Sequence, residues 1–305
     1  MNETPRDLFG YGASPPDPRW PHGSRVALNL VLNYEEGGEN TPLDGDPASE
    51  AYLHEVVGAP ATVGRRNLNT ESMFEFGSRA GFWRVHRLVT SFGLPLTVFG
   101  VGQALERNPD AARAMVDAGW EVASHGWRWI DYGEFSPEEE RAHLERAVAA
   151  IEDVCGQRPV GWYTGRGSDA TRRLVVEHGG FLYDSDSYAD ELPYWLDVDG
   201  TAHLVVPYTL DANDFKFLLP NGFVTADDFA TYLIDSLDEL RGDGGRLMSV
   251  GLHCRIVGRP GRIAGLRRFL EHVAACDDVW VATRADIARH WRAEHPAQGS
   301  ANGGA

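Results

Sequence analysis

Residues 26–36 read VALNLVLNYEE, a dense aliphatic run that ends in two adjacent carboxylates. A strand that is buried on both faces of a parallel sheet has this near-continuous aliphatic character. The run therefore predicts such a strand over residues 26–32, with Glu35 and Glu36 just beyond its carboxyl end. Neighbours in a regular strand point to opposite faces, but the glycines at 37 and 38 indicate that the strand has ended, so both carboxylates can reach one cavity.

Aliphatic segments of this kind alternate with helical segments along the rest of the chain. The expected helices cover residues 78–92, 109–118, 136–155, 170–177, 226–241, 264–275 and 286–294. The third has the clearest start signal, because Ser136, Pro137 and Glu139 form a capping-box pattern. Repeated alternation predicts an α/β fold, a distorted (β/α) barrel of about seven parallel strands rather than an open doubly wound sheet. NYEEGGEN is not the glycine fingerprint of a dinucleotide site.

The pattern predicts one catalytic barrel domain over residues 24–296 of the 305-residue chain. Residues 1–23 are polar and proline-rich and are expected to form an extended surface arm. The polar, glycine-rich stretch 37–70 is too long for a simple connection, so we interpret it as a functional insertion or lid. The Gly- and Ala-rich tail, 297–305, is expected to fray.

Charge and cysteine content narrow the class of protein. The formal net charge of −17 disfavours nucleic acid and anionic lipid as partners, whereas a neutral substrate meets no such repulsion. The simplest meaning of the acidity is good solubility. The N-terminus does not have the pattern of a secretory signal, and no apolar run approaches the ~20 residues that cross a bilayer. An odd, sparse set of three cysteines suggests reduced thiols, so we expect a cytoplasmic protein.

Polar and aromatic residues follow the expected strands, and in a parallel barrel the site forms at the carboxyl ends of the strands. The candidate site residues are Glu35, Glu36, His125, Trp129, Tyr163, Arg166, Asp184, Trp195 and His253. Such a set can activate water and protonate a leaving nitrogen. Each also has a plainer explanation: a solvated loop for the acids, a satisfied structural histidine, or a tryptophan that only packs.

The order of these residues resembles the polysaccharide deacetylase superfamily. An acidic pair follows the first strand in NYEE (33–36), a histidine follows a middle strand in SHGWRW (124–129), and LHC (252–254) stands near the end. Longer strings are similar to the cofactor-independent allantoinases of that superfamily. They include PRDLFGYG (5–12), GSRAGFWR (77–84), GWYTGR (161–166), PYTLDANDFKF (207–217) and GLHCRIVGRPGR (251–262).

The sequence departs from the deacetylase pattern at two of the positions that bind the metal. The second ligand histidine of that pattern falls at Trp129, and the ligand aspartate falls at Glu36. A two-histidine, one-carboxylate site needs all three ligands, so Glu36 and His125 alone are too few for tight zinc binding. We therefore expect no metal and no cofactor, in agreement with what the allantoinase resemblance implies.

The resemblance implies hydrolytic opening of the hydantoin ring of allantoin to allantoate. Glu35 falls at the position of the general base and His253 at that of the general acid. Glu36 and His125 would hydrogen-bond the ureido or ring N–H groups, while Tyr163 or Arg166 could steady the oxyanion. Trp129 would fill the former metal space. Asp184 and Trp195 are further candidates for binding this small neutral ureide. The resemblance also implies a homo-oligomer, a tetramer, with the arm and the 37–70 insertion at subunit contacts.

Three other functions stay open at this point. The chain could be a metal-dependent deacetylase of N-acetyl sugars, although Trp129 and the missing export signal count against that. It could hydrolyse another cyclic amide or imide. It could also be a non-catalytic binding protein on a barrel that has lost its activity, which the retained acids and histidines argue against.

Overall fold

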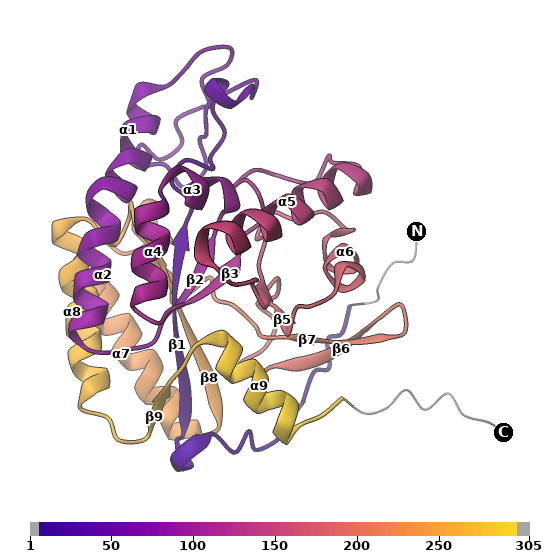
Figure 1. Cartoon of the computed structure of the whole chain (residues 1–305). Helices are drawn as coiled ribbons and strands as arrows, with labels where there is room; N and C mark the ends of the chain where they lie inside the picture. The colour runs from indigo at the N-terminus through magenta and orange to yellow at the C-terminus, as the bar shows by residue number, and fades with distance from the viewer. Residues whose placement is uncertain (1–5, 298–305) are drawn as a thin grey trace.

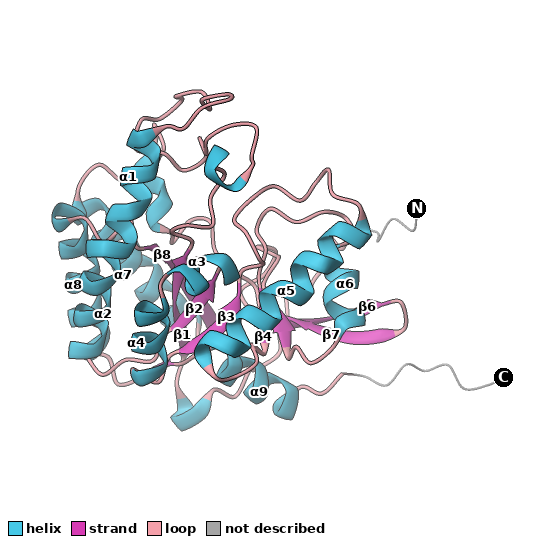
Figure 2. Cartoon of the chain, turned by 45° about the horizontal axis from the view of Figure 1, so that its top comes forward, coloured by secondary structure: helices cyan, strands magenta, loops and turns pink. Residues whose placement is uncertain are grey.

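A computed structural model describes residues 6–297 as a curled, mostly parallel sheet with helices around it (Figures 1 and 2). The strands are β1 (Val26–Tyr34), β2 (Thr97–Gly100), β3 (Glu121–Ser124), β4 (Gly161–Trp162), β5 (Tyr183–Asp184), β6 (Tyr194–Val198), β7 (Thr201–Val205), β8 (Arg246–His253) and β9 (Val279–Val281). Their order is β6-β7-β5-β4-β3-β2-β1-β8, and β9 pairs with β1. The expected α/β fold of the deacetylase type is therefore confirmed.

The sheet curls into a barrel that strands alone do not close. Irregular backbone joins its two ends: Leu247 of β8 donates its N–H to the carbonyl of Glu191, and Gly251 donates to that of Ala212. One edge of the sheet differs from the expected all-parallel arrangement, because β6 and β7 form an antiparallel hairpin there. Its turn is Asp199–Gly200, with both residues at positive φ, as a tight hairpin turn requires.

Helices cover the outside of the sheet. They are α1 (Leu68–Phe76), α2 (Phe82–Ser91), α3 (Gly102–Arg107), α4 (Pro109–Asp117), α5 (Pro137–Cys155), α6 (Thr171–His178), α7 (Ala226–Asp243), α8 (Pro260–Ala274) and α9 (Arg284–Glu294). The capping box at the start of α5 is present, since the Ser136 hydroxyl accepts from the Glu139 N–H and the Glu139 carboxylate accepts from the Ser136 N–H. The short helix α3 was not predicted, and the helix expected at 78–92 begins earlier, at Leu68.

A π-helical turn, Gly77–Gly81, joins α1 to α2 and lets this helix approach the barrel closely. A Cβ on Gly77 would lie 2.3 Å from the Glu36 carboxylate, and one on Gly81 would lie 2.0 Å from the Cys254 carbonyl. Only glycine fits at such a close approach. The GSRAG string therefore sets the distance between the helix and the ends of β1 and β8.

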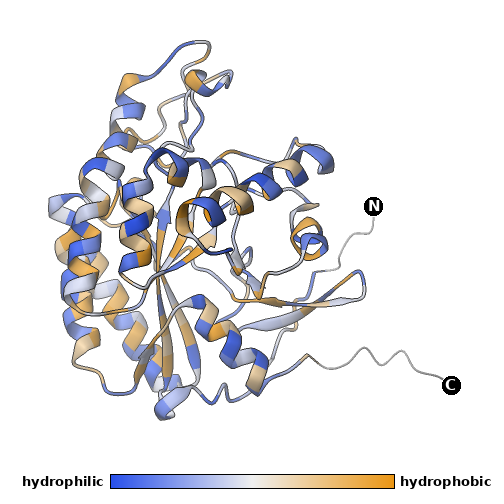
Figure 3. Cartoon of the chain, viewed as in Figure 1, coloured by the Kyte–Doolittle hydropathy of each residue, from blue (hydrophilic) through white to orange (hydrophobic). Residues whose placement is uncertain are grey.

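Apolar side chains fill the space between the sheet and the helices, and hydrophobic residues concentrate along the strands (Figure 3). The described part of the N-terminal arm is tied to its own chain: Trp20 is buried and donates to the Arg246 carbonyl, and Tyr11 donates to the Pro193 carbonyl. The segment between β1 and α1 contains one short 3-10 turn, Pro42–Asp44. Within residues 6–297 no helix is long and apolar enough to cross a membrane. The tail from 298 onward, expected to fray, and residues 1–5 lie outside the described residues.

Candidate active site

A small cavity of about 60 Å³ opens at the carboxyl ends of the strands. It is lined by Glu35, Tyr52, Leu53, His125, Trp129, Tyr163, Thr164, Gly165, Arg166, Tyr188, Tyr208, Leu210, Asn213, Phe215 and His253. Since a buried water needs at least about 10–15 Å³ of such volume, the enclosed space corresponds to a few water-sized groups. Six of the nine residues predicted for the site thus meet here. Glu36, Asp184 and Trp195 do not line it.

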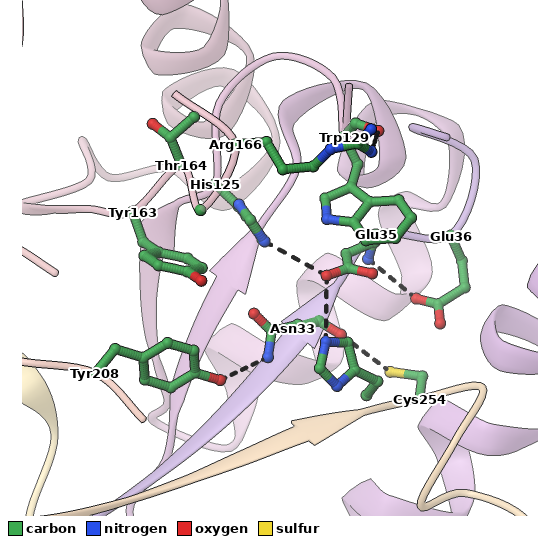
Figure 4. A network of polar contacts seen from close by, with 12 residues as sticks. Asn33, Glu35, Glu36, His125, Trp129, Tyr163, Thr164, Arg166, Tyr208 and Cys254 are labelled. Atoms are coloured by element: carbon green, nitrogen blue, oxygen red, sulfur yellow. Dashed lines mark hydrogen bonds and ion pairs between the residues drawn. The ribbon is translucent and has the colours of Figure 1, made fainter. Parts of the chain in front are cut away.

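Glu35 lies at the centre of the polar contacts (Figure 4). It follows the last residue of β1 and is almost fully buried. One carboxylate oxygen is 3.4 Å from Nε2 of His125 and 3.4 Å from Nε2 of His253. The other oxygen accepts a hydrogen bond of 2.6 Å from the Arg255 guanidinium. One oxygen is therefore held by a cation, and the other faces two imidazoles.

The charges around Glu35 keep it ionised. Burial alone would raise its pKa, but the charges of Arg255 and His253, with hydrogen bonds from both histidines, hold that pKa well below the usual value. His253 has the opposite shift. Burial opposes its protonation, yet the Glu35 and Asp214 carboxylates raise its pKa to about 9. At neutral pH the cavity therefore contains a carboxylate beside an imidazolium.

Asp214, a residue that the sequence reasoning did not single out, orients His253. It lies in a 3-10 turn, Asp214–Leu218, and is fully buried. Its carboxylate accepts from Nδ1 of His253 at 2.6 Å and from the backbone N–H groups of His253 and Val257. Because Nδ1 is bound in this way, Nε2 is the nitrogen that faces Glu35 and the cavity. A carboxylate–imidazole pair of this kind holds a proton donor in position.

Glu36 lies behind Glu35 and not in the cavity. Its carboxylate accepts from the backbone N–H groups of Glu35 and Arg255, and it packs against Gly77. Burial raises the pKa of Glu36 to about 7. The predicted contact between Glu36 and substrate N–H groups is therefore not supported by its position. The reason is that the chain turns directly after β1 and directs the two acids to different sides.

Arg255 is the second residue that the strand-end reasoning missed. It comes two positions after the end of β8, and its side chain is fully buried. Its guanidinium lies 2.6 Å from Glu35 and 3.8 Å from Glu36, and it packs against the rings of Phe74 and Trp129. A search extended to the second residue after each strand would have found it.

Aromatic and charged residues form the mouth of the cavity. Trp129 stacks on Tyr52, with ring centroids 5.8 Å apart. Arg166 lies over both rings and forms an ion pair of 3.2 Å with Glu50. Tyr52 and Glu50 come from the 37–70 segment, so this segment completes the wall of the cavity.

The opposite wall is a cluster of aromatic rings. Tyr163 stacks on Phe99 at 4.7 Å and contacts Tyr208 at 4.9 Å. The hydroxyl groups of Tyr163 and Tyr188 share a hydrogen bond of 2.8 Å, and the Asn33 amide donates to the Tyr208 hydroxyl. These contacts fix the rings, and Tyr163, Tyr188 and Tyr208 line the cavity.

The other two predicted residues lie elsewhere. Asp184 is buried, but its carboxylate is bound by Arg172 at 2.8 Å and by His203 at 2.9 Å, an arrangement that lowers its pKa to about 2 despite burial. Trp195 is on β6 and donates its indole N–H to the His295 carbonyl. Trp195 pairs with Leu204 near the carboxyl end of β7, but its ring packs against Arg292 of α9 and does not line the cavity. The predicted roles of Asp184 and Trp195 in substrate binding are therefore not supported by where they lie.

A larger hollow of about 670 Å³ lies at the other end of the sheet, between α2 and α4. Its lining includes Leu94, Pro95 and Trp120, which come before β2 and β3. Sites in parallel barrels form at the carboxyl ends of the strands, and the acid, imidazole and guanidinium groups described above meet only in the smaller cavity among the described residues. We therefore assign the chemistry to the smaller cavity.

The residues that fall at the metal position of the deacetylase pattern do not fit a divalent ion. Trp129 supplies an indole that cannot coordinate, and the Glu36 carboxylate already accepts two backbone N–H groups. Arg255 places a positive charge beside both acids. Across residues 6–297 no three His, Cys, Asp or Glu side chains converge to hold a metal. The chemistry is therefore derived from the side chains alone.

Comparison with known proteins identifies the family of this chain. The family model for polysaccharide deacetylase matches residues 70–180. A Schizosaccharomyces pombe protein described as "Putative polysaccharide deacetylase" is 43% identical over 97% of this chain and 99% of its own length. A crystal structure of a probable polysaccharide deacetylase from Pseudomonas aeruginosa PAO1 is 52% identical, with a TM-score of 0.94 over 96% of this chain and 100% of its own. The crystal structure of PuuE allantoinase gives the same identity and TM-score over 96% of this chain and 99% of its own.

Proposed function

The chain belongs to the polysaccharide deacetylase family, and from this premise we propose that it is an allantoinase, which opens the hydantoin ring of allantoin without a required metal. One observation carries the proposal. Glu35 and His253 keep their acid–base geometry in a cavity where Trp129 stands at a ligand position of the metal. The full-length similarity to PuuE allantoinase supports the choice of ring.

In the proposed reaction Glu35 takes a proton from a water molecule, and the resulting hydroxide attacks a ring carbonyl carbon. A C–O bond forms, and the carbonyl electron pair moves onto oxygen. When this tetrahedral intermediate collapses, the ring C–N bond breaks and the His253 imidazolium protonates the leaving nitrogen. The proton on Glu35 then returns to His253, so that the net change is addition of one water.

His125 is suited to bind the substrate. Its Nε2 faces Glu35, while its buried Nδ1 has no hydrogen-bond partner among residues 6–297. The imidazole ring lines the cavity, so its Nε2 edge can exchange a hydrogen bond with a polar group of the substrate. Tyr163 and Arg166 remain the proposed groups for the oxyanion, because both line the same cavity.

The test of the proposed function is allantoate formation from racemic allantoin by purified protein, before and after divalent metals are stripped with a chelator. We expect equal turnover in both states, because a guanidinium, not a metal, lies beside the acids. Acetate release from N-acetylated sugar oligomers is measured in parallel. Acetate release that needs added zinc, without allantoate formation, would replace the proposal by the deacetylase function that the names of two relatives suggest.

The pH profile should report His253. The pKa of about 9 means that kcat/KM, which reflects groups of the free enzyme, should fall as the pH rises through about 9, because the imidazolium proton is lost. Asp214→Asn removes the carboxylate that accepts from Nδ1, so this alkaline limb should move down by about one unit or more. Rate measurements from pH 6 to 10.5 would check both. An unmoved limb in the Asp214 variant would contradict the assignment of His253 as the acid.

We also propose that the chain forms a homo-oligomer through the 37–70 segment. Several large apolar side chains of this segment are exposed, namely Leu43, Tyr52, Val56, Val57, Val63 and Leu68. An exposed cluster of apolar residues commonly marks a protein interface. The double variant Val56→Glu, Val57→Glu should lower the molar mass measured by light scattering, while Val224→Glu, at an exposed valine on another part of the chain, should not. A wild-type monomer would contradict the proposal.

A further inference from the structure

Arg255 is held in an unusual environment for a charged side chain. It is fully buried, and one of its nitrogens contacts Glu35 at 2.6 Å and Glu36 at 3.8 Å. The other two nitrogens, Nε and Nη2, have no hydrogen-bond partner within residues 6–297. The centre of the guanidinium instead lies 4.4 Å from the Phe74 ring and 4.9 Å from the Trp129 ring. A cation in contact with two aromatic faces gains attraction from their quadrupoles.

Glu35 and Glu36 are adjacent buried acids, and the ionised Glu35 in particular requires a positive charge beside it. Removing an ionised carboxylate from water is costly unless a partner of opposite charge is close. In the deacetylase pattern a divalent metal supplies that charge at the positions of Glu36, His125 and Trp129. Here Trp129 cannot bind a metal, but its ring packs on Arg255. Trp129 thus stands at the position of a metal ligand, and its ring also packs on Arg255, the cation that lies beside the two acids.

We propose that Arg255 is the built-in cation of this site: with Trp129 packed against it, it takes over the electrostatic role of the metal, and its charge excludes a divalent ion. The inference rests on the proposed function only for its effect on catalysis. Arg255 binds one oxygen of Glu35 and so directs the other oxygen toward His125 and His253. It is a positioning residue, because it does not line the cavity and acts through Glu35.

The first experiment separates binding from turnover. Arg255→Met replaces the guanidinium by an apolar chain, and we expect kcat for allantoin to fall on the order of 100-fold while KM changes less than about threefold, since substrate contacts remain. Arg255→Lys restores the charge and should recover part of the lost kcat. Arg259→Met is the matched control, because Arg259 also packs on an aromatic ring, that of Phe76, but outside the cavity. A kcat for Arg255→Met within about twofold of wild type would overturn the positioning role.

The second experiment measures zinc binding by titration calorimetry and does not depend on the substrate. Trp129→His restores the missing imidazole, and we compare this variant with Trp129→His, Arg255→Met. The double variant should bind zinc at least about 100-fold more tightly, because a unit positive charge a few ångströms away opposes a divalent ion. Equal affinity in the two variants, or no binding in either, would overturn the exclusion of the metal. If the methionine variant does not fold, Arg255→Gln provides a second neutral side chain for the same comparison.

Turnover of allantoin and affinity for zinc distinguish a failure of the proposed function from a failure of the inference about Arg255. If zinc binds only after Arg255 is neutralised, the inference stands even if the wild-type protein has no activity on allantoin. If allantoin is hydrolysed but the two Trp129→His variants bind zinc equally, the proposed function stands and the inference about Arg255 fails.

Discussion

Glu35→Gln is expected to lower kcat for allantoin by about three orders of magnitude, within the range that general acid–base groups contribute. The glutamine keeps the shape of the side chain but cannot accept a proton from water. It also removes the negative charge that keeps His253 protonated, since Glu35 lies 3.4 Å from Nε2 of that residue. One substitution therefore weakens both the base and the acid.

Glu140→Gln is the matched control for this variant. Glu140 is also a buried carboxylate, but it accepts from the hydroxyls of Ser168 and Thr171 and does not line the cavity. Its kcat should stay within about twofold of wild type. Both variants are compared by steady-state kinetics after circular dichroism has confirmed their fold. A Glu35→Gln enzyme that retains more than a tenth of the wild-type kcat would show that Glu35 is not the base.

The expectation that site residues follow the ends of parallel strands located much of the site from sequence. It succeeded because parallel strands bring their carboxyl ends to one edge of the sheet. Asn33 of β1 pairs with His253 of β8, and Ser124 of β3 pairs with Trp162 of β4. These registers place Glu35, His125, Tyr163 and His253 around one cavity. Each of them is at, or one residue beyond, the end of its strand, so a reading of local sequence was sufficient.

This expectation missed residues whose role in the site depends on contacts with segments that are distant in sequence. Asp214 lies in a 3-10 turn outside the strands, and only its proximity to His253 in space gives it a role. Arg255 is two residues beyond its strand, and its burial depends on Phe74 and Trp129. No periodicity in the sequence encodes such a meeting of three separate segments.

A different error concerned the hairpin β6–β7. The Asp199–Gly200 pair is a strong hairpin signal, and alternation of strands and helices led us to overlook it. A related expectation concerned Trp195 of β6, which was placed in the wall of the cavity. Trp195 lies near the carboxyl end of β7, opposite Leu204, but its indole packs against α9 and donates to the His295 carbonyl.

Arg284→Met is expected to lower the free energy of unfolding by about 3–5 kcal/mol, because several buried acceptors lose their donor at once. Arg284 is fully buried at the start of α9, and its guanidinium reaches into the barrel beneath the aromatic wall of the cavity. Its hydrogen bonds go to acceptors from several strands and the residues after them, namely Asn29, Ser185, Val206, Pro207 and Ser249. Methionine fills a similar volume but leaves these buried acceptors without a donor, and each such loss is costly.

Urea unfolding followed by tryptophan fluorescence would measure the effect, with Arg289→Met as the control. Arg289 is also in α9, but it is exposed, and among the described residues its ion pair is with Asp286 alone, so its loss should change the free energy by less than about 1 kcal/mol. Arg284→Lys keeps the charge but has fewer donors, and it should fall between the two. A loss below about 1 kcal/mol for Arg284→Met, with an unchanged m value, would show that water replaces the guanidinium inside the barrel. The expected larger loss would instead show that this arginine ties the sheet together beneath the site, where irregular backbone and not strand pairing closes the barrel.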